Sequence, residues 1–412
     1  MFLHFIGIGG AGMAPLAELA FRRGHQITGS DNELNSKCRH LIELGIRITP
    51  YHCAENISEK CDMVIFSSAV SPDNCERIAA EKMHIRTLRR GDFLAEFASS
   101  YKRCVAVSGT HGKSSITALL VSVLRSCGKN PGFMIGAEVA NLPSCAPGDG
   151  DIFVTEADES DGTHTKLKNF LGIVPNLEDD HSWSVGGTEI LEKNFCTFAE
   201  NSEKLLYYSS EKTDRLFKNH PDQIKFTGFP ENFAGLYGFQ AENAFLAYNA
   251  SLMLGCKAAS AEKASADYPQ VARRMRVVSS DEKLTVIEDY AHHPTEVQSA
   301  LNFLRHRYPQ KHLRILFQPH RYARLEKYFD RFAGVLSEAD SCLVVPVFAA
   351  WSESGKVNSS MLAEKIKNGS YCSGSWQEIA AETMKNIPEQ AVIAVLGAGD
   401  IEKVLHYLQI TT

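Results

Sequence analysis

The sequence predicts an α/β protein of three domains in series, and three observations support that prediction. Apolar runs of strand length alternate with stretches of helical periodicity, as in parallel sheets with crossover helices. This alternation restarts after residues 99–103 and again after residues 268–270. A chain of 412 residues is also too long for a single hydrophobic core. We therefore expect domains over residues 1–100, 101–267 and 268–412.

The elements of the first domain follow from hydrophobic period and from the residues at their ends. Gly24 is the expected C-cap of the first helix, because glycine adopts the left-handed conformation at helix ends without strain. The strands expected are Phe2–Ile8, His25–Gly29 and Met63–Ser67, and the helices expected are Met13–Arg23 and Asn35–Leu44.

The same patterns place the elements of the other two domains. The strands expected are Cys104–Val107, Ile152–Thr155, Leu171–Val174, Leu284–Ile287, Arg314–Phe317, Ser341–Val345 and Ala391–Leu396. Helical spacing predicts Thr295–Arg307 and Leu325–Leu336. The asparagine- and lysine-rich stretch Asn201–Gln223 has no clear period, and we expect an irregular excursion there.

Composition narrows the class of protein. Hydrophobic residues make up 44% and charged residues 22% of the chain, which is ordinary for a globular protein. A net charge of −6 gives no overall attraction to nucleic acid or anionic membrane. The 11 cysteines form no C-x-x-C pair, which indicates reduced thiols. No leader or apolar span of membrane length is apparent, so we expect a soluble cytoplasmic protein.

A glycine-rich loop, Gly7-Ile8-Gly9-Gly10-Ala11-Gly12, follows the first predicted strand. It matches the G-x-G-x-x-G pattern, in which backbone N–H groups and a helix N-terminus surround a diphosphate. Asp31, beyond the next strand, could accept a ribose hydroxyl. The pattern leaves three interpretations open: a nicotinamide or flavin site, a different nucleotide diphosphate, or a tight structural turn.

A second loop, Gly109-Thr110-His111-Gly112-Lys113-Ser114, follows the strand that ends at Val107. A full Walker A motif would have glycine where this chain has Val107, so this is a shortened P-loop. Lys113 is suited to the β- and γ-phosphates of ATP, and Ser114 or Ser115 to Mg²⁺. The alternative is a surface Gly-Lys turn. Two such loops together indicate an enzyme that holds two phosphorylated compounds.

Acidic clusters follow the next two strands of the central domain. Glu156–Asp161 is ordinarily interpreted as a solvated loop, but its place one strand after the P-loop favours a metal site, with Glu156 as the expected ligand. His181 follows two aspartates at the end of the other strand. An Asp-His pair is often only structural, yet Glu156 and His181 could share one metal ion.

Two loops of the third domain combine a carboxylate, histidines and arginines at strand ends. They are Asp289–Pro294 and Gln318–Arg324. Arg321 and Arg324 have i, i+3 spacing, so they could share one helical face and grip a carboxylate or phosphate. The alternative is a polar helix start with surface arginines.

Taken together, these motifs resemble the Mur ligases, the ATP-dependent amide-forming enzymes of peptidoglycan precursor synthesis. The resemblance covers nearly the whole chain, in the family's order. The motifs are His4–Met13, Ser67-Ser68-Ala69-Val70, Gly109–Ser114, Glu156–Asp161, Asp289–Glu296, Phe317–Arg324 and Gly397–Ile401.

The resemblance implies a fold with a Rossmann-like N-terminal domain for a UDP-sugar, a central P-loop ATPase-like domain for ATP, and a C-terminal Rossmann-like domain for an amino acid. UDP, not a dinucleotide, would occupy the first loop, and the implied contacts are Gly9, Gly10, Ala11, Gly12, Asp31, His52, Ser67 and Ser68. ATP would contact Gly109–Ser115, with Asn243 beside the adenine and Asp289 facing the nucleotide. Ser114, Glu156 and His181 would hold Mg²⁺. The amino-acid pocket would be Tyr290, His292, Arg321 and Arg324, with Lys113, His292 and the two arginines as catalytic residues.

The implied reaction joins L-alanine to the lactyl carboxylate of UDP-N-acetylmuramate through an acyl phosphate, in a monomer or weak dimer. Addition of a preformed tripeptide is the alternative within the class, and an oxidoreductase built on the first loop alone is a rival outside it. The chain departs from the family pattern at Trp183, where an aspartate is usual, and at Phe239-Gln240, where His-Asn is usual. A nucleotide sensor without turnover is therefore a further hypothesis.

Overall fold

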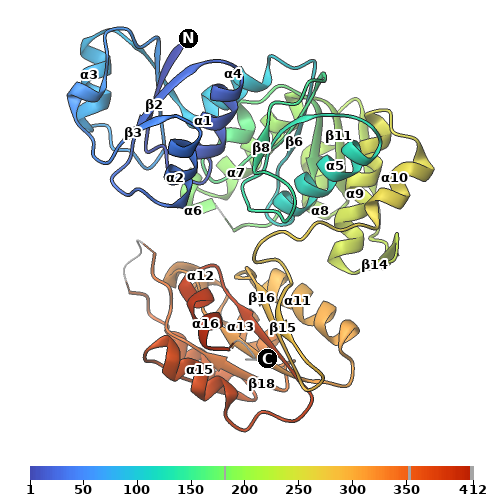
Figure 1. Cartoon of the computed structure of the whole chain (residues 1–412). Coiled ribbons are helices and arrows are strands. Elements are labelled where there is room, and N and C mark those ends of the chain that lie inside the picture. Colours follow the sequence, from blue (N-terminus) through green and yellow to red (C-terminus); the bar gives the residue numbers. More distant parts are fainter. Residues whose placement is uncertain (181, 351–353, 409–412) are drawn as a thin grey trace. The chain divides into compact units, whose positions relative to one another are not determined.

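The computed structural model describes residues 1–180, 182–350 and 354–408 (Figure 1). The chain forms two compact units. One comprises Met1–Leu236 with Gln240–Pro269, and the other comprises Tyr237–Phe239 with Gln270–Thr412. Two of the three large sheets belong to the first unit and one to the second. The mixed α/β fold that the sequence predicts is confirmed.

The N-terminal sheet has five parallel strands in the order β3-β2-β1-β4-β5. Their bounds are β1 Phe2–Ile6, β2 Gln26–Ser30, β3 Arg47–Thr49, β4 Met63–Phe66 and β5 Arg86–Arg89. The order reverses between β1 and β4, so the loops that follow these two strands diverge. Open α/β sheets bind ligands at such a reversal.

Helices α1 (Met13–Arg22), α2 (Ser36–Glu43), α3 (Cys75–Lys82) and α4 (Arg90–Ala98) connect these strands. Gly24 ends α1 with a φ of +84°. The His25 N–H donates to the carbonyl of Ala20 at 3.1 Å, and the Gly24 N–H donates to that of Phe21 at 2.8 Å. The predicted glycine C-cap is therefore present, in the arrangement that satisfies the last free carbonyls of a helix.

The central sheet has seven strands in the order β12-β11-β10-β6-β9-β7-β8. Their bounds are β6 Arg103–Val107, β7 Gly132–Met134, β8 Cys145–Ala146, β9 Ile152–Glu156, β10 Asn169–Val174, β11 Ser202–Tyr208 and β12 Gln223–Phe226. The short edge strand β8 pairs antiparallel with β7, and the other pairs are parallel. Helices α5 (Lys113–Ser126), α6 (Ser182–Val185), α7 (Thr188–Glu200), α8 (Glu211–Phe217), α9 (Phe239–Met253) and α10 (Ala258–Ser265) accompany this sheet.

The prediction of an irregular excursion over Asn201–Gln223 is wrong. The stretch contains β11 and α8, and β11 pairs in parallel with both β10 and β12. Its apolar centre, Leu205 to Tyr208, is buried. Polar residues at both ends of this stretch hid its hydrophobic period. The short apolar run between them is nevertheless buried, and it forms the strand.

The sheet of the second unit has the order β15-β16-β20-β17-β18-β19. Its strands are β15 Arg276–Ser280, β16 Leu284–Asp289, β17 His312–Phe317, β18 Ser341–Val344, β19 Gly369–Tyr371 and β20 Ala391–Leu396. Its helices include α11 (Pro294–Arg307), α12 (Tyr322–Lys327), α13 (Phe329–Leu336), α14 (Ser359–Lys365) and α15 (Trp376–Met384). The antiparallel edge strand β15 was not predicted.

The single helix predicted over Leu325–Leu336 is in fact two helices. Tyr328 separates α12 from α13 with a φ of −116° and a ψ of 20°, which lies outside the helical region. Its ring packs against His293 with ring centroids 4.6 Å apart. Because hydrophobic spacing continues across this break, the period alone does not reveal it.

No helix in the described ranges is long and apolar enough to cross a membrane. All 11 cysteines are free thiols.

Candidate functional site

The first glycine loop is attached to the neighbouring strand β2. The N–H groups of Gly7 and Ile8 donate to the backbone carbonyl of Ser30 at 2.8 and 3.1 Å. The Gly9 N–H donates to Oδ2 of Asp31 at 2.8 Å. A Cβ atom on Gly9 would lie 2.5 Å from the Sγ atom of Cys38, so only glycine fits there. Asp31 thus fixes the loop, and its contact with a ribose stays a prediction.

The remaining residues predicted for the UDP-sugar gather at the same edge of the sheet. Gly10, Ala11 and Gly12 complete the turn into α1. Ser67 follows β4, its N–H donates to the carbonyl of Ile6 at 3.2 Å, and Ser68 comes next in that turn. The Nδ1 atom of His52 lies 2.9 Å from the hydroxyl of Ser30. These loops therefore meet at the strand-order reversal.

The P-loop joins β6 to α5 and uses glycines in conformations that other residues rarely adopt. Gly109 has a φ of +148° and Gly112 a φ of +86°. Asn176, just after β10, holds the loop from the side: it accepts a hydrogen bond from the His111 N–H at 2.7 Å and donates one to the His111 carbonyl at 3.1 Å. A Cβ atom on Gly109 would lie 2.7 Å from the Asn176 carbonyl oxygen. Asn176 was not among the predicted site residues.

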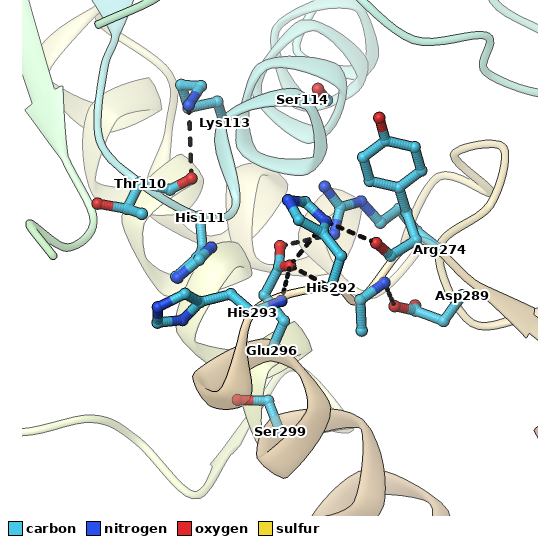
Figure 2. A network of polar contacts seen from close by, with 12 residues as sticks. Thr110, His111, Lys113, Ser114, Arg274, Asp289, His292, His293, Glu296 and Ser299 are labelled. Atoms are coloured by element: carbon cyan, nitrogen blue, oxygen red, sulfur yellow. Dashed lines mark hydrogen bonds and ion pairs between the residues drawn. The ribbon is translucent and has the colours of Figure 1, made fainter. Parts of the chain in front are cut away.

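Lys113 is the first residue of α5, and its ammonium group folds back onto the loop. It donates to the carbonyl of Gly109 at 2.6 Å and lies 3.4 Å from that of Thr110, the contact drawn in Figure 2. It also contacts both carboxylate oxygens of Glu159, at 2.9 and 3.1 Å. Burial opposes the charge on Lys113, but the nearby carboxylates of Glu159 and Asp158 outweigh it and raise the pKa of Lys113. The ammonium group therefore stays charged.

Oxygen donors suited to a divalent cation lie beside the P-loop. Glu156 ends β9, the strand next to β6, and is paired in register with Val107. The Ser114 hydroxyl donates to its Oε2 at 2.8 Å, and the Gly136 N–H donates to its Oε1 at 2.6 Å. Burial raises the pKa of Glu156, although the hydrogen bonds from Gly136 and Ser114 and the charge of Lys113 act in the opposite direction. A hydroxyl and a carboxylate are oxygen ligands of the kind Mg²⁺ prefers.

The structure places only some of the other residues named for this domain. His181, the other predicted metal ligand, lies outside the described residues, and so does the side chain of Trp183. Asn243 lies in α9 next to the P-loop, where a Cβ atom on Gly112 would come within 2.9 Å of its Oδ1 atom. Its Nδ2 atom donates to the Tyr268 hydroxyl at 3.0 Å. Ser115 is buried in the first turn of α5.

This close approach makes Gly112→Ala a sharp test of the P-loop geometry. The substitution forces a side chain into the left-handed region and against Asn243, so we expect the free energy of unfolding to fall by about 1–2 kcal/mol and ATP binding to weaken by about tenfold or more. Calorimetry and thermal unfolding measure both effects. Gly128→Ala is the matched control, since Gly128 has a φ of +76° beyond the other end of α5 and a Cβ atom there would have nothing within 4 Å. Equal effects of the two substitutions on ATP affinity would contradict the argument.

In the second unit, a buried polar network surrounds the loop after β16 (Figure 2). Asp289 accepts hydrogen bonds from the N–H groups of Met275 at 2.8 Å and Ala291 at 2.7 Å. Glu296, in the first turn of α11, accepts from the His292 N–H at 3.1 Å and from Arg274 at 3.2 Å. These contacts fix the loop that contains the predicted residues Asp289, Tyr290 and His292.

The ring of His292 is oriented by its own loop. Its Nδ1 atom lies 2.9 Å from the Tyr290 carbonyl, which can only accept a hydrogen bond. Nδ1 therefore holds the proton, and in the neutral ring Nε2 is the basic atom. The Tyr290 ring is covered by the guanidinium groups of Arg273 and Arg274, at 4.8 and 5.3 Å from its centroid. The roles of Tyr290 and His292 toward an amino acid stay predictions.

The prediction that Arg321 and Arg324 share one helical face is wrong. Helix α12 begins at Tyr322, and Arg321 precedes it with a φ of +67°, its N–H bonded to the Phe348 carbonyl at 2.9 Å. Arg324 lies inside α12, only 8% exposed, with Nη1 3.0 Å from the Nδ1 atom of His320. The two arginines therefore have different backbone conformations. That both guanidinium groups bind one carboxylate stays a prediction.

Burial has a measurable consequence at Asp289. It raises the pKa of this carboxyl to about 6, from an ordinary value of 3.8. Since the folded chain binds this proton more tightly than the unfolded chain, the group's stabilising contribution is complete below pH 3.8 and is lost as the pH rises through about 6. The difference corresponds to about 3 kcal/mol. We expect a carboxyl-carbon NMR titration to give an apparent pKa near 6, with the signal identified by its loss in Asp289→Asn. A titration near 4 would contradict the prediction.

A P-loop with a carboxylate at the end of the adjacent strand defines an α/β protein of the class that binds nucleoside triphosphates. Two family models match the chain: "Mur ligase family, catalytic domain" over residues 2–102 and "Mur ligase, glutamate ligase domain" over residues 273–399. The chain belongs to the Mur ligase family, and it is an ATP-dependent enzyme that forms amide bonds.

Individual relatives agree with the family assignment. The UDP-N-acetylmuramate–L-alanine ligase of Sulfurihydrogenibium sp. is 33% identical over 437 residues, which cover 97% of this chain and 95% of that protein. The crystal structure of the UDP-N-acetylmuramate–alanine ligase from Thermotoga maritima matches with a TM-score of 0.81 and 24% identity, over 99% of this chain and 98% of that one. A murein peptide ligase from Psychrobacter arcticus matches with a TM-score of 0.69 and 20% identity, over 100% and 99%. The two structures support the three-domain Mur ligase fold.

Proposed function

We propose that this chain joins L-alanine to UDP-N-acetylmuramate at the expense of ATP, in the synthesis of peptidoglycan precursors. The observation that supports it most is the 33% identity to a UDP-N-acetylmuramate–L-alanine ligase across nearly the full length of both chains. The P-loop and the strand-end carboxylate Glu156 supply the groups that ATP chemistry needs. We expect the reaction to take place in the cytoplasm, in a monomer or weak dimer.

The chemistry begins with activation of a carboxylate, because an amide cannot form until a carboxylate oxygen becomes a leaving group. A lactyl carboxylate oxygen attacks the γ-phosphorus of ATP, so that an acyl phosphate and ADP form. The amine of alanine then attacks the acyl carbon and phosphate departs, which gives the amide. The P-loop N–H groups and the Lys113 ammonium group stabilise the charge on the phosphoryl oxygens during the first step. For this, Lys113 exchanges its contacts with Gly109 and Glu159 for phosphate oxygens.

The reaction also needs a metal ion, a base for the ammonium group of alanine and contacts for the alanine carboxylate. Ser114 and Glu156, with His181 as a further candidate, would hold Mg²⁺, and the bound cation would compensate phosphate charge. The Nε2 atom of His292 is placed by its Nδ1 contact to accept the proton that the ammonium of alanine must lose before it attacks. Arg321 and Arg324 are the proposed contacts of the alanine carboxylate.

The decisive experiment measures phosphate release with UDP-N-acetylmuramate and a panel of amino acids, with the tripeptide of the alternative hypothesis included. Turnover with alanine, glycine or serine supports the proposal, and turnover with the tripeptide alone supports the recycling ligase. Tight ATP binding without amide product would favour the nucleotide sensor. Tight NAD binding that UDP does not displace would revive the oxidoreductase.

A further inference from the structure

A buried carboxylate with several hydrogen-bond donors lies beneath the loops predicted for the uridine nucleotide. Glu76, in the first turn of α3, has a side chain that is 0% exposed. Its Oε1 atom accepts hydrogen bonds from the Asn56 amide and from the Cys53 N–H at 3.3 Å. Its Oε2 atom accepts from the Ser30 hydroxyl at 2.5 Å and lies 3.3 Å from Nδ1 of His52. The position near a helix N-terminus also favours a negative charge.

The charge state of Glu76 follows from these contacts. Burial alone would raise the pKa of this carboxyl, but interactions with His4, Ser30 and Asn56 outweigh it and lower the pKa to about 2. His4 lies on the far side, with Nε2 3.7 Å from Oε2 of Glu76 and Nδ1 2.9 Å from the Thr28 hydroxyl. Glu76 is therefore an ionised carboxylate at neutral pH, and an ionised carboxylate can only accept hydrogen bonds.

The ionised state of Glu76 determines where the protons lie in the hydrogen bonds that join Glu76, Ser30 and His52. Two oxygen atoms 2.5 Å apart need a proton between them, so the hydroxyl proton of Ser30 points to Glu76. The hydroxyl has only that one proton, so it must accept from Nδ1 of His52, 2.9 Å away. Nδ1 of His52 consequently bears a hydrogen. In the neutral ring this leaves a lone pair on Nε2, which makes no hydrogen bond to the residues that the structure describes.

His52 also has a fixed place relative to the first glycine loop. The backbone carbonyl of Ser30 holds the N–H groups of Gly7 and Ile8, while its hydroxyl holds the ring of His52. One residue thus positions both the loop and the histidine. The His52 side chain is 16% exposed, so the ring is anchored by Nδ1 and still reaches the surface.

We propose that Glu76 is a positioning residue which, through the Ser30 hydroxyl, holds His52 in the tautomer that presents Nε2 as a hydrogen-bond acceptor to the uridine nucleotide. The ligand half of this inference rests on the proposed function. A uridine nucleotide offers such an acceptor two kinds of donor, the N3–H of uracil and the ribose hydroxyls. Cytosine has no hydrogen on N3, so an acceptor that meets the base favours UDP over CDP.

In the isosteric variant Glu76→Gln we expect the opposite tautomer of the His52 ring. The amide oxygen replaces Oε1, where two donors need an acceptor, so the amide nitrogen takes the place of Oε2. This nitrogen donates to the Ser30 hydroxyl, which then donates to Nδ1 of His52. The proton of the neutral ring moves to Nε2, and the acceptor offered to the nucleotide becomes a donor.

Nitrogen-15 NMR of the histidine rings in the full chain, at a pH where His52 is neutral, tests the relay directly. The His52 signals are identified by their loss in His52→Gln. We expect a protonated Nδ1 and an unprotonated Nε2 in the wild type, and the reverse in Glu76→Gln. Glu18→Gln is the matched control, because Glu18 is also a buried partner of a histidine, 2.9 Å from Nε2 of His40. A wild-type ring protonated on Nε2 would overturn the relay, and the wild-type spectrum decides this even if a variant fails to fold.

Calorimetry with UDP, CDP and 2′-deoxy-UDP tests the ligand half. We expect Glu76→Gln to weaken UDP binding by about tenfold and to leave ATP binding unchanged. A loss of the preference for UDP over CDP assigns the contact to the base, and a loss of the preference for UDP over 2′-deoxy-UDP assigns it to the ribose. Unchanged UDP affinity would overturn the ligand half. If the wild type had the expected tautomer but no affinity for UDP, both the ligand half and the proposed function would be overturned. If it bound UDP but had the opposite tautomer, only the relay would be overturned.

Discussion

Lys113→Ala should lower amino-acid-dependent ADP release by on the order of 10³-fold and leave UDP binding measurable. Lys113 is the lysine of the P-loop motif, and its ammonium group donates to the Gly109 carbonyl at 2.6 Å, within the loop that we expect to bind phosphate. Removing it takes away a charge that acts mainly in the transition state of phosphoryl transfer. The UDP-sugar loops belong to a different sheet, whose hydrogen bonds do not involve Lys113.

The measurement is single-turnover ADP formation with saturating ATP, UDP-N-acetylmuramate and alanine, together with calorimetry for UDP. Lys193→Ala is the control, since Lys193 is an exposed lysine on α7 of the same sheet domain. Lys113→Arg separates charge from shape, because a guanidinium group keeps the charge but not the compact ammonium geometry. Retained turnover in Lys113→Ala would remove the ATP role of this loop and with it the proposed reaction.

The glycine loops could be predicted because their signal is local. A strand, a run of glycines and the start of a helix occupy one short stretch of sequence, and positive φ angles at Gly7 and Gly112 follow from that residue type. The strand ends that bear Glu156 and Asp289 could also be predicted, since an apolar run in the sequence indicates where a buried strand stops.

The partners of these loops could not be predicted, because they come from distant parts of the chain. Asn176 contacts the P-loop from the end of the neighbouring strand β10, Glu159 pairs with Lys113, and Glu76 approaches Ser30 from α3. The signal for each was only a polar residue near a strand or helix end. Which donor meets which acceptor depends on strand order, and the strand order is a tertiary property.

Backbone details of α12 explain the error over the arginines. The i, i+3 rule holds only where both residues are helical, and Arg321 has left-handed φ. A left-handed arginine is a strained conformation that no sequence pattern indicates. The spacing rule therefore failed at the one residue where the helix had not yet begun.

Glu156→Gln should abolish the metal dependence of the enzyme without unfolding it. In the structure Glu156 accepts one hydrogen bond from Ser114 and one from the Gly136 N–H. A glutamine oxygen can keep the Gly136 contact, and its amide nitrogen can donate to the Ser114 hydroxyl, so the fold has no reason to fail. The negative charge that a divalent cation needs is lost, however, and we expect turnover to fall by on the order of 10²- to 10³-fold.

Thermal unfolding with increasing Mg²⁺ in the presence of ATP separates metal binding from general damage, because a ligand that binds only the folded chain raises the midpoint. The wild type should gain stability as Mg²⁺ is added, and Glu156→Gln should gain little. Glu138→Gln is the matched control, since Glu138 is an exposed carboxylate in the loop after β7 and offers the same change of charge. Ser114→Ala should show a smaller defect of the same kind, because it removes a neutral ligand and leaves the carboxylate. If Glu156→Gln responded to Mg²⁺ as the wild type does, the cation would have to be held elsewhere, and the carboxylate at the end of β9 would be only an acceptor that closes the loop after β7.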